Sequence, residues 1–400
     1  MELPEAPQSA PRRRVWPIVL SITLLLALVV TLLAVSNAKR RDEPDRGDAD
    51  LATLQSEVAA IRELEFRRPV KAEFLTSEEI AQEIRDAVAA GDFGAGLPDG
   101  DTLAALGMVP EGTDLEELLT DAGAASVLGF YDPETKRLVV QSSDAEELTP
   151  FAQTTLAHEL THAVTDQHFD LARFLTGDEP DDELAARTAV AEGDATLAMT
   201  QWQQQYLSFG DIVGIGIEAV GDLGALEEIP PALVDIMSSP YLDGLAFIQR
   251  LYQEGGWKAV DRAYRDPPTT TEQVLHSERY LTRDRARDVR PPEAPPGATA
   301  LSDGQVGELF LREMLDVSGR VPSNEAAGAA AGWDGGAYTT SRSGSDVIVA
   351  VTLAWDSSAD ATEFAAVLGR WGEDFGSSRC LNVLPGSAEL VSFTLATAGC

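Results

Sequence analysis

The chain has 400 residues and a formal net charge of −36, because 66 acidic residues outnumber 30 basic ones. Such a surface repels the phosphates of nucleic acids and anionic lipid headgroups, so the composition argues against both as partners. Hydrophobic residues make up 44% of the chain, which is enough for a core, and the length suggests one large or two ordinary domains behind an N-terminal tail.

The first predicted element is the apolar run from Val15 to Val35, which holds no charged residue. At about 1.5 Å per residue, a helix of this length crosses the hydrocarbon core of a bilayer. The short basic N-terminus favours a single-pass signal anchor, with residues 1–14 in the cytoplasm. A cleaved signal peptide is one alternative, since Ser36-Asn37-Ala38 is a small-x-small site, and a buried core helix is another. The signal anchor and the cleaved signal peptide both place the remaining chain outside the cytoplasm, and cleavage would make it a secreted protein.

Residues 36–65 are predicted to form a juxtamembrane linker and a helix. Residues 39–50 are charged and contain proline and glycine, as flexible linkers do. Apolar residues then recur at helical spacing over residues 50–65, which predicts a helix that stands off the membrane.

The main domain is predicted to span residues 66–290. Thr76 and Glu79 have the spacing of a capping box, which indicates the start of a helix. Composition and periodicity predict, in chain order, a strand over 70–75, a helix over 76–89, a short helix over 114–122, and strands over 126–131 and 137–141.

A metal-binding pattern follows these strands. His158, Glu159 and His162 form H-E-x-x-H, and they include two of the four histidines in the chain. On a helix, residues i and i+4 lie one turn apart on the same face, so both imidazoles are able to hold one metal ion. Glu159 then faces a water molecule on that ion without being a ligand. The pattern predicts a zinc hydrolase with Glu159 as the general base.

The residues around the motif favour a helix. Thr149 is a good N-cap, Pro150 suits the first helical position, and apolar residues recur at helical spacing to about Gln167. A surface helix that carries two histidines by chance is the alternative.

The segment from Ala157 to Asp166 resembles the active-site helix of the thermolysin-like metallopeptidases, the gluzincin group. Upstream, residues 129–132 and 137–140 are similar to the strand hairpin that precedes this helix in the family. The resemblance implies an α+β, zincin-like fold, one catalytic Zn²⁺ ion and a peptide or protein substrate. Later segments resemble uncharacterised, membrane-anchored bacterial proteins with the same motif.

The resemblance also assigns roles to residues outside the motif. It implies that Leu128, Gly129 and Phe130 form an open strand edge that binds substrate by strand addition, whereas a plain structural hairpin is the alternative. It further implies that a downstream histidine or tyrosine, His276 or Tyr280, holds the oxyanion. A structural histidine is the alternative for His276.

Zinc with two histidine ligands needs a third protein ligand. We predict Glu192, because its neighbours are mainly alanine and valine, and a carboxylate there is costly unless it is paired or metal-bound. Gly193 is expected to let this helix pack closely on the motif helix. Asp194, His168 and Glu183 stay open as alternative ligands.

Two aspartates are predicted to lie behind the ligands, where metal sites need groups that orient the imidazoles. Asp166 lies four residues after His162, and Asp194 lies two residues after the predicted third ligand. A plain surface aspartate is the alternative for Asp166.

Helices are predicted over most of residues 183–264, with a glycine-spaced, mobile stretch at 210–224. Residues 291–400 are predicted to form a C-terminal unit with a helix over 301–316 and then two strands, a helix and two strands. Cys380 and Cys400 are predicted to form a disulfide in an oxidising compartment, and two free thiols are the alternative.

Together these patterns predict an α+β protein with a mainly helical body, a small mixed sheet and a small C-terminal α+β unit. The predicted function is that of a membrane-anchored, extracytoplasmic zinc metallopeptidase. The alternatives are a catalytically inactive, zinc-stabilised binding protein and a zinc hydrolase of a non-peptide amide.

Overall fold

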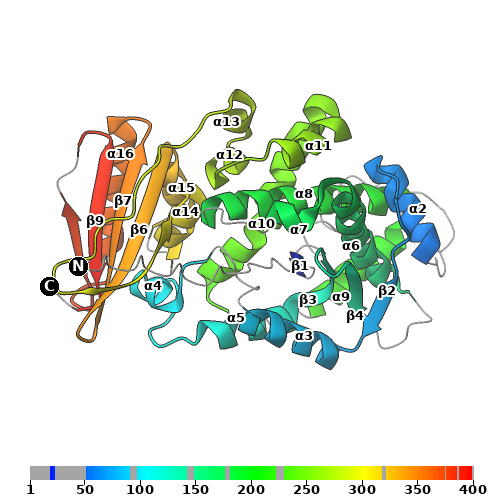
Figure 1. Cartoon of the computed structure of the whole chain (residues 1–400), viewed down its shortest axis with the longest axis horizontal. Helices are drawn as coiled ribbons and strands as arrows, with labels where there is room; N and C mark the ends of the chain where they lie inside the picture. The colour runs from blue at the N-terminus through cyan, green and yellow to red at the C-terminus, as the bar shows by residue number, and fades with distance from the viewer. Residues whose placement is uncertain are drawn as a thin grey trace, which may run out of the picture.

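The protein is α+β, with a helix-rich body beside a sheet-rich C-terminal unit (Figure 1). The computed structural model describes residues 19–22, 51–90, 97–141, 148–175, 181–221, 229–317, 321–373, 375–384 and 387–398. Each part has its own core, and helices α14 and α15 lie between the large sheet and the body (Figure 1).

The elements of the body, in chain order, are β1 (Val19–Ile22), α2 (Leu51–Arg62), β2 (Ala72–Leu75), α3 (Ser77–Ala90), α4 (Gly100–Ala105), α5 (Leu115–Ser126), β3 (Val127–Asp132), β4 (Arg137–Gln141), α6 (Pro150–Phe169), α7 (Leu171–Leu175), α8 (Asp181–Tyr206), α9 (Phe209–Gly221), α10 (Pro231–Gly255), α11 (Trp257–Arg265), α12 (Thr271–Leu275) and α13 (Ser277–Thr282). The C-terminal elements are β5 (Thr299–Gln305), α14 (Glu308–Asp316), α15 (Ser323–Ala330), β6 (Trp333–Ser343), β7 (Asp346–Trp355), α16 (Ser358–Glu373), β8 (Cys380–Leu384) and β9 (Leu390–Ala396).

Of the apolar run at residues 15–35, the structure describes only β1. This strand pairs antiparallel with β3, and its Leu20 lies opposite Phe130. The remainder of the run lies outside the described residues. Within the described ranges, no helix has both the length and the apolarity that crossing a bilayer requires.

Helix α2 confirms the helix predicted over residues 50–65, and it packs into the body, while its position relative to a membrane stays a prediction. Leu54 and Val58 are buried in the core of the body, and the guanidinium of Arg62 is fully buried. The apolar stripe seen in the sequence therefore faces protein, because α6 and α8 cover it.

The small sheet has the strand order β1-β3-β4-β2 and is mixed, since β2 runs parallel to β4 and the other neighbours are antiparallel. The prediction of an open edge at Leu128, Gly129 and Phe130 is wrong for this arrangement, because β3 lies between β1 and β4. A Cβ on Gly129 would stand 3.1 Å from the Thr155 side chain, so glycine lets β3 lie close against α6.

Helix α6 begins as the sequence predicts. The Thr149 hydroxyl accepts a hydrogen bond from the amide of Ala152, and Pro150 occupies the first turn. The helix ends at Phe169, where Asp170 adopts a left-handed conformation. Nearly all of its side chains are buried, so α6 runs through the body as a central core helix.

Helices α8 and α10 cross at Gly193 and Gly244, where their backbones touch. Gly193 therefore serves packing on α10, which corrects the expectation that it packs on the motif helix. Of the glycine-spaced stretch at 210–224, residues 210–221 form most of helix α9, whereas the prediction was a mobile segment, and residues 222–224 lie outside the described residues.

The C-terminal unit is built on an antiparallel sheet with the strand order β5-β6-β7-β9-β8. Strand β5 and helix α14 replace the single helix predicted over residues 301–316. The side chains of Trp355, Phe364 and Trp371 are fully buried between the sheet and α16. Leu103 of α4 belongs to this same core, so a helix from the N-terminal half of the chain packs against the C-terminal unit.

The cysteine at position 380 begins β8 and is disulfide-bonded. Cys400, its predicted partner, lies outside the described residues.

Candidate metal centre

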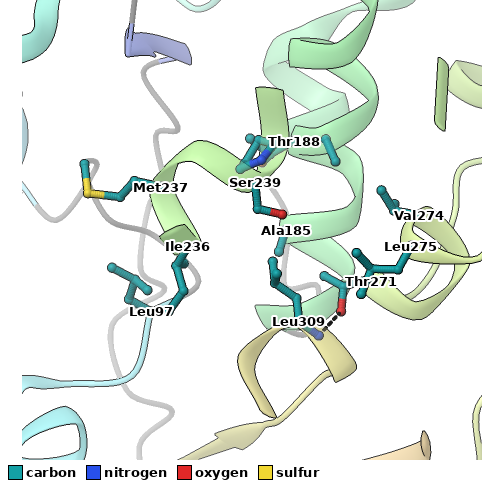
Figure 2. Close-up of a pocket in the computed structure, with 12 residues that line it drawn as sticks. Leu97, Ala185, Thr188, Ile236, Met237, Ser239, Thr271, Val274, Leu275 and Leu309 are labelled. Carbon is teal, nitrogen blue, oxygen red and sulfur yellow. Dashed lines mark hydrogen bonds between the residues drawn. The ribbon is translucent and has the colours of Figure 1, made fainter. Parts of the chain in front are cut away.

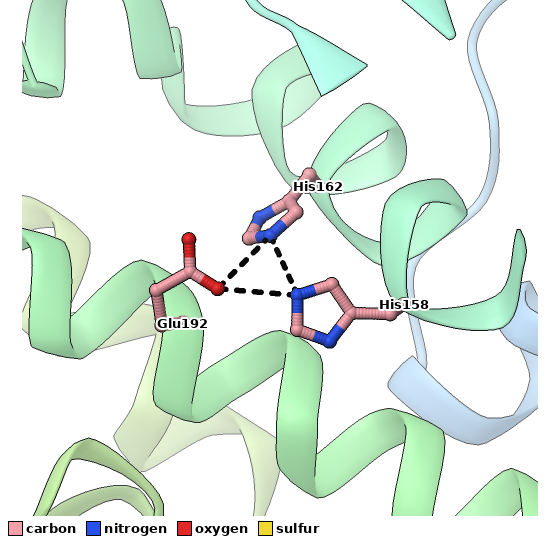
Figure 3. A group of neighbouring side chains, drawn as sticks. All are labelled: His158, His162 and Glu192. Atoms are coloured by element: carbon pink, nitrogen blue, oxygen red, sulfur yellow. Dashed lines mark hydrogen bonds and ion pairs between the residues drawn. The ribbon is translucent and has the colours of Figure 1, made fainter. Parts of the chain in front are cut away.

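Helices α6 and α8 bring three predicted ligands together (Figure 3). His158 and His162 project from consecutive turns of α6, and Glu192 projects from α8 toward both rings. All three side chains are about 1% exposed. Because α6 is a core helix and α8 packs along it, the ligand atoms converge inside the protein.

The spacing of these atoms matches a tetrahedral metal site. Nε2 of His158 lies 3.1 Å from Oε2 of Glu192 and 3.1 Å from Nε2 of His162. The third side of the triangle, from His162 to Glu192, measures 3.5 Å. Zinc bonds of about 2.0–2.1 Å at tetrahedral angles hold ligand atoms about 3.3 Å apart. The three residues therefore fit a zinc ion in both chemistry and spacing.

The electrostatics of the cluster favour an ionised carboxylate. Burial alone would raise the pKa of Glu192, but the neighbouring His162 and His158 outweigh this effect and lower it. A carboxylate in an apolar interior needs such partners, because an unpaired buried charge is very costly. The ring nitrogen Nδ1 of His158 is buried and has no hydrogen-bond partner among the described residues.

Glu159 occupies the position next to the first ligand on α6 and is fully buried. Successive residues of a helix are rotated by about 100°, so its carboxylate leaves the helix from a face adjacent to that of His158. Glu159 is therefore buried and next to His158 in the chain, and its catalytic role stays a prediction.

The two carboxylate oxygens of Asp194 bind groups other than a ligand imidazole, which corrects the role predicted for it. Oδ1 accepts a hydrogen bond from Nε of Arg62 at 2.7 Å, and Oδ2 accepts one from the hydroxyl of Tyr264 at 2.8 Å. Arg62 also pairs with Asp261 and lies over the ring of Trp257. This buried network ties α2 and α11 to α8, on which the third ligand is mounted.

The prediction that Asp166 orients a ligand ring is corrected in the same way. Its oxygens accept hydrogen bonds from the hydroxyl of Tyr131, the ammonium of Lys136 and the amide of Leu171. Asp166 therefore fixes the end of α6 to the β3–β4 hairpin and to α7, a structural role that the i+4 spacing from His162 did not reveal.

His276 and Tyr280 also have partners away from the three ligands. Nε2 of His276 pairs with Glu308 at 2.8 Å, and the hydroxyl of Tyr280 donates to the carbonyl of Asp266 at 2.9 Å. Neither side chain hydrogen-bonds to the ligands, and the structure favours the structural alternative for His276. The alternative ligands His168 and Glu183 lie outside the cluster, because His168 binds the backbone of Glu65 and Glu183 pairs with Arg187.

One residue beside the centre was not identified from the sequence. The ring of Tyr241, from α10, lies with its centroid 6.2 Å from that of His158 and is 4% exposed. Tyr241 precedes Gly244 by one helical turn, so the close crossing of α8 and α10 sets its position. The only sequence signal is a tyrosine at helical spacing from a glycine, which is too common to be diagnostic.

Comparisons with known proteins leave the function open. A family model described as a domain of unknown function (DUF8575) matches residues 298–389, which lie in the C-terminal unit. No curated protein and no solved structure matches the chain.

Proposed function

We propose that the protein is a zinc-dependent metallopeptidase with a zincin-like catalytic body. The observation that carries the proposal is the convergence of His158, His162 and Glu192 at spacings that suit tetrahedral zinc. The resemblance of residues 157–166 to the thermolysin-like active-site helix supports the same conclusion.

The number of protein donors favours a catalytic site. Within the described part of the chain, the cluster contains three His, Cys, Asp or Glu ligands. A structural zinc site is usually closed by four protein ligands, whereas a catalytic one keeps a position for water. The inactive binding protein is therefore the weaker candidate, because it has no use for an open position or for Glu159.

In this proposal, different residues carry out different steps of peptide hydrolysis. A zinc ion in this site would lower the pKa of bound water toward 7 and polarise the substrate carbonyl. Glu159 accepts the proton of the attacking water and passes it to the leaving amine. Tyr241, which lies against His158, is the candidate donor to the developing oxyanion, in place of His276 and Tyr280.

The test combines a metal assay with a cleavage assay. Wild-type protein should contain about one zinc ion per chain and should cleave a quenched fluorescent peptide library until a chelator is added. Glu159→Gln should retain the zinc and lose cleavage, whereas His162→Ala should lose both. The Tyr280→Phe variant is the control, because its hydroxyl donates to the carbonyl of Asp266 and makes no hydrogen bond to the three predicted ligands among the described residues.

Three results would separate the alternatives. Zinc binding without cleavage of any peptide, but with release of amine from small acylated amines, would favour a non-peptide amidase. Zinc binding with neither activity would favour a binding protein. Full activity of Glu159→Gln would overturn the mechanism.

We also propose that residues 15–35 anchor the protein in a membrane, with the catalytic body on the extracytoplasmic side. The support is the uncharged apolar run and its basic flanks. A spanning helix would require residues 19–22, which pair with β3 as strand β1 in the structure, to leave the small sheet. Protease added outside intact cells should cleave the body of an anchored protein. Recovery of the full chain in the soluble cytoplasmic fraction would contradict the proposal.

A further inference from the structure

Two adjoining pockets lie where the body meets the C-terminal unit. The larger has a volume of about 140 Å³ and lies between α8, α10, α12 and α14 (Figure 2). The smaller has a volume of about 40 Å³ and reaches the first turn of α8. The lining residues that both contain are Leu97, Ala185, Ile236, Thr271 and Leu309. The two pockets are therefore chambers of one cavity, and we call them the apolar chamber and the carboxyl chamber.

The apolar chamber suits a hydrocarbon group. Apolar side chains from three helices form much of its wall: Ala189, Ile236, Met237 and Val274. The hydroxyl groups of Thr188 and Ser239 also line it, and both already donate hydrogen bonds within the protein. Its volume is similar to that of an engineered cavity of about 150 Å³ that binds benzene. The chamber is thus large enough for an apolar group of about the size of a phenyl ring.

The carboxyl chamber is lined by the side chain of Asp182, which is 6% exposed. Thr271 donates to this carboxylate twice, from its hydroxyl to Oδ1 at 2.6 Å and from its amide to Oδ2 at 3.0 Å. A Cβ on Gly307 would stand 1.6 Å from Oδ1, so glycine lets the chain before α14 lie directly on the carboxylate. Each carboxylate oxygen has about two acceptor positions, so both are able to accept a further donor.

The charged groups that act most strongly on this carboxylate, among the described residues, are acidic. Burial raises the pKa of Asp182 to about 6, and the negative charges of Glu308 and Asp181 raise it as well, against the hydrogen bonds from Thr271. A carboxylate buried without a cationic partner is costly when it ionises. A cation in the carboxyl chamber would remove that cost.

Both chambers reach the protein surface. Ile236 and Met237 are partly exposed at the apolar chamber, and Gln305 is exposed at the carboxyl chamber. The amide of Leu309 donates to the hydroxyl of Thr271 at 3.2 Å, which holds the start of α14 against the body (Figure 2). A ligand is therefore able to enter a preformed cavity, and it contacts both parts of the protein there.

We propose that this cavity binds a small primary amine, with the ammonium group on Asp182 and an apolar group of up to about the size of a phenyl ring between α8 and α10. The ammonium group supplies the missing positive charge and three donors, and the apolar group fills the larger chamber. The site does not depend on the proposed peptidase function. It gives the C-terminal unit a share in ligand binding, because Gln305, Gly307 and Leu309 line the cavity.

Isothermal titration calorimetry of the full chain at about pH 8 tests the proposal with three probes. Asp182 is ionised at this pH, and alkylamines are protonated, since the pKa of an ordinary alkylammonium is about 10.4. 2-Phenylethylamine should bind about 10-fold or more tightly than 2-phenylethanol, because charge-assisted hydrogen bonds are about twice as strong as neutral ones. Ethylamine should bind about 10-fold or more weakly than 2-phenylethylamine, since it buries less apolar surface. Equal affinities for the aromatic amine and the alcohol would overturn the proposal.

Two variants locate the site. Ile236→Trp should fill the apolar chamber and weaken 2-phenylethylamine binding about 10-fold or more. Leu242→Trp is its matched control, because Leu242 lies on the same helix, is 38% exposed and does not line the cavity. An unchanged affinity in Ile236→Trp would mean that the amine associates with the acidic surface, and would reject the cavity.

Asp182→Asn should abolish the preference for the amine over the alcohol while the alcohol still binds. Circular dichroism shows whether this variant folds, and the wild-type and Ile236→Trp titrations decide the question if it does not. A folded Asp182→Asn protein that keeps the full preference would exclude Asp182 as the partner of the ammonium group.

Discussion

A Cβ atom on Gly193 would stand 2.2 Å from the carbonyl oxygen of Gly244, closer than any real side chain is found to backbone. Gly244 is confined in the same way, since a Cβ on it would stand 2.3 Å from the carbonyl oxygen of Ala189 on α8. Helices α8 and α10 therefore cross with their backbones in direct contact. The crossing lies one residue from Glu192 and three residues from Tyr241, so it positions the proposed third ligand and the candidate oxyanion donor together.

Gly193→Ala should separate the two helices and move Glu192 away from the imidazoles. Forcing a methyl group into a tightly packed core costs about 1–3 kcal/mol, and here the neighbour is backbone that cannot rotate away. We expect a lower urea midpoint together with weaker zinc binding. Gly369→Ala in α16 is the control, because nothing lies within 4 Å of its Cβ. That change should leave zinc binding intact and stabilise the helix by about 1 kcal/mol. Equal zinc affinity in Gly193→Ala and wild type would show that the crossing does not position the site.

Asp194→Asn should strongly destabilise the body. Among the described residues, it leaves the fully buried guanidinium of Arg62 with the partly exposed Asp261 as its one charged partner. Breaking a buried ion pair on one side costs about 3–5 kcal/mol, and chemical denaturation would measure it.

The control for this prediction is the exposed pair between Arg370 and Glu325. Glu325→Gln should cost less than about 1 kcal/mol, because water screens exposed pairs. A loss of stability in Asp194→Asn as small as that in the control would rule out a major structural role for the buried network.

Tyr241→Phe should lower kcat by about 100-fold or more if its hydroxyl stabilises the oxyanion, since one such donor is worth about that much. The ring contact with His158 is kept in this variant, so zinc content should be unchanged. Steady-state kinetics with a defined peptide, together with elemental analysis, would measure both. If Tyr241→Phe keeps the wild-type kcat, the hydroxyl does not stabilise the oxyanion, and the residue serves packing alone.

The junction between the body and the C-terminal unit should lose stability as the pH rises. Burial raises the pKa of Asp182 to about 6 and that of Glu272 to about 8, and the hydrogen bond with Glu308 raises the pKa of His276. Each group holds its proton more tightly in the folded protein than in the unfolded chain. Its contribution is therefore complete below the unfolded pKa, about 4 for the carboxyls and about 6.5 for histidine, and is lost as the pH rises through the folded pKa.

Calorimetry between about pH 5 and pH 9 should show a melting temperature that falls with rising pH. Burial raises the pKa of Glu272 most, Arg279 lowers it, and three nearby acidic residues, Glu308, Asp356 and Asp284, raise it further. Glu272→Gln removes the titrating carboxyl and should flatten the decline in the upper half of this range. The same slope in Glu272→Gln and wild type would exclude Glu272 as its source.

Local sequence patterns predicted several features of the fold correctly. The capping box between Thr76 and Glu79 forms, and α6 begins at Pro150 behind the Thr149 cap. These features depend on residues within one helical turn, so spacing alone is sufficient to recognise them. The pairing of β3 with β4 follows for the same reason, since the two strands are joined by a short turn.

Sequence reasoning failed where the partner of a side chain lies far away in the chain. Nothing near Arg62 indicates that it pairs with a residue 132 positions later, and an i+4 spacing suggested a ligand-orienting role for Asp166 that the hairpin contacts exclude. The helix predicted over 301–316 divides into β5 and α14 because β5 pairs with β6. In each case the free energy comes from long-range packing, which overrides local preference.

By itself, the sequence determined the H-E-x-x-H helix and its cap, and it predicted that Glu192 joins the two histidines, because each depends on the spacing or the apolar surroundings of nearby residues. The tertiary structure alone decided that Gly193 meets Gly244, that Tyr241 lies near His158 and that Leu309 of α14 lines an apolar pocket together with residues of α8 and α10. These contacts join helices distant in sequence, and only the packing of the folded chain brings such surfaces together.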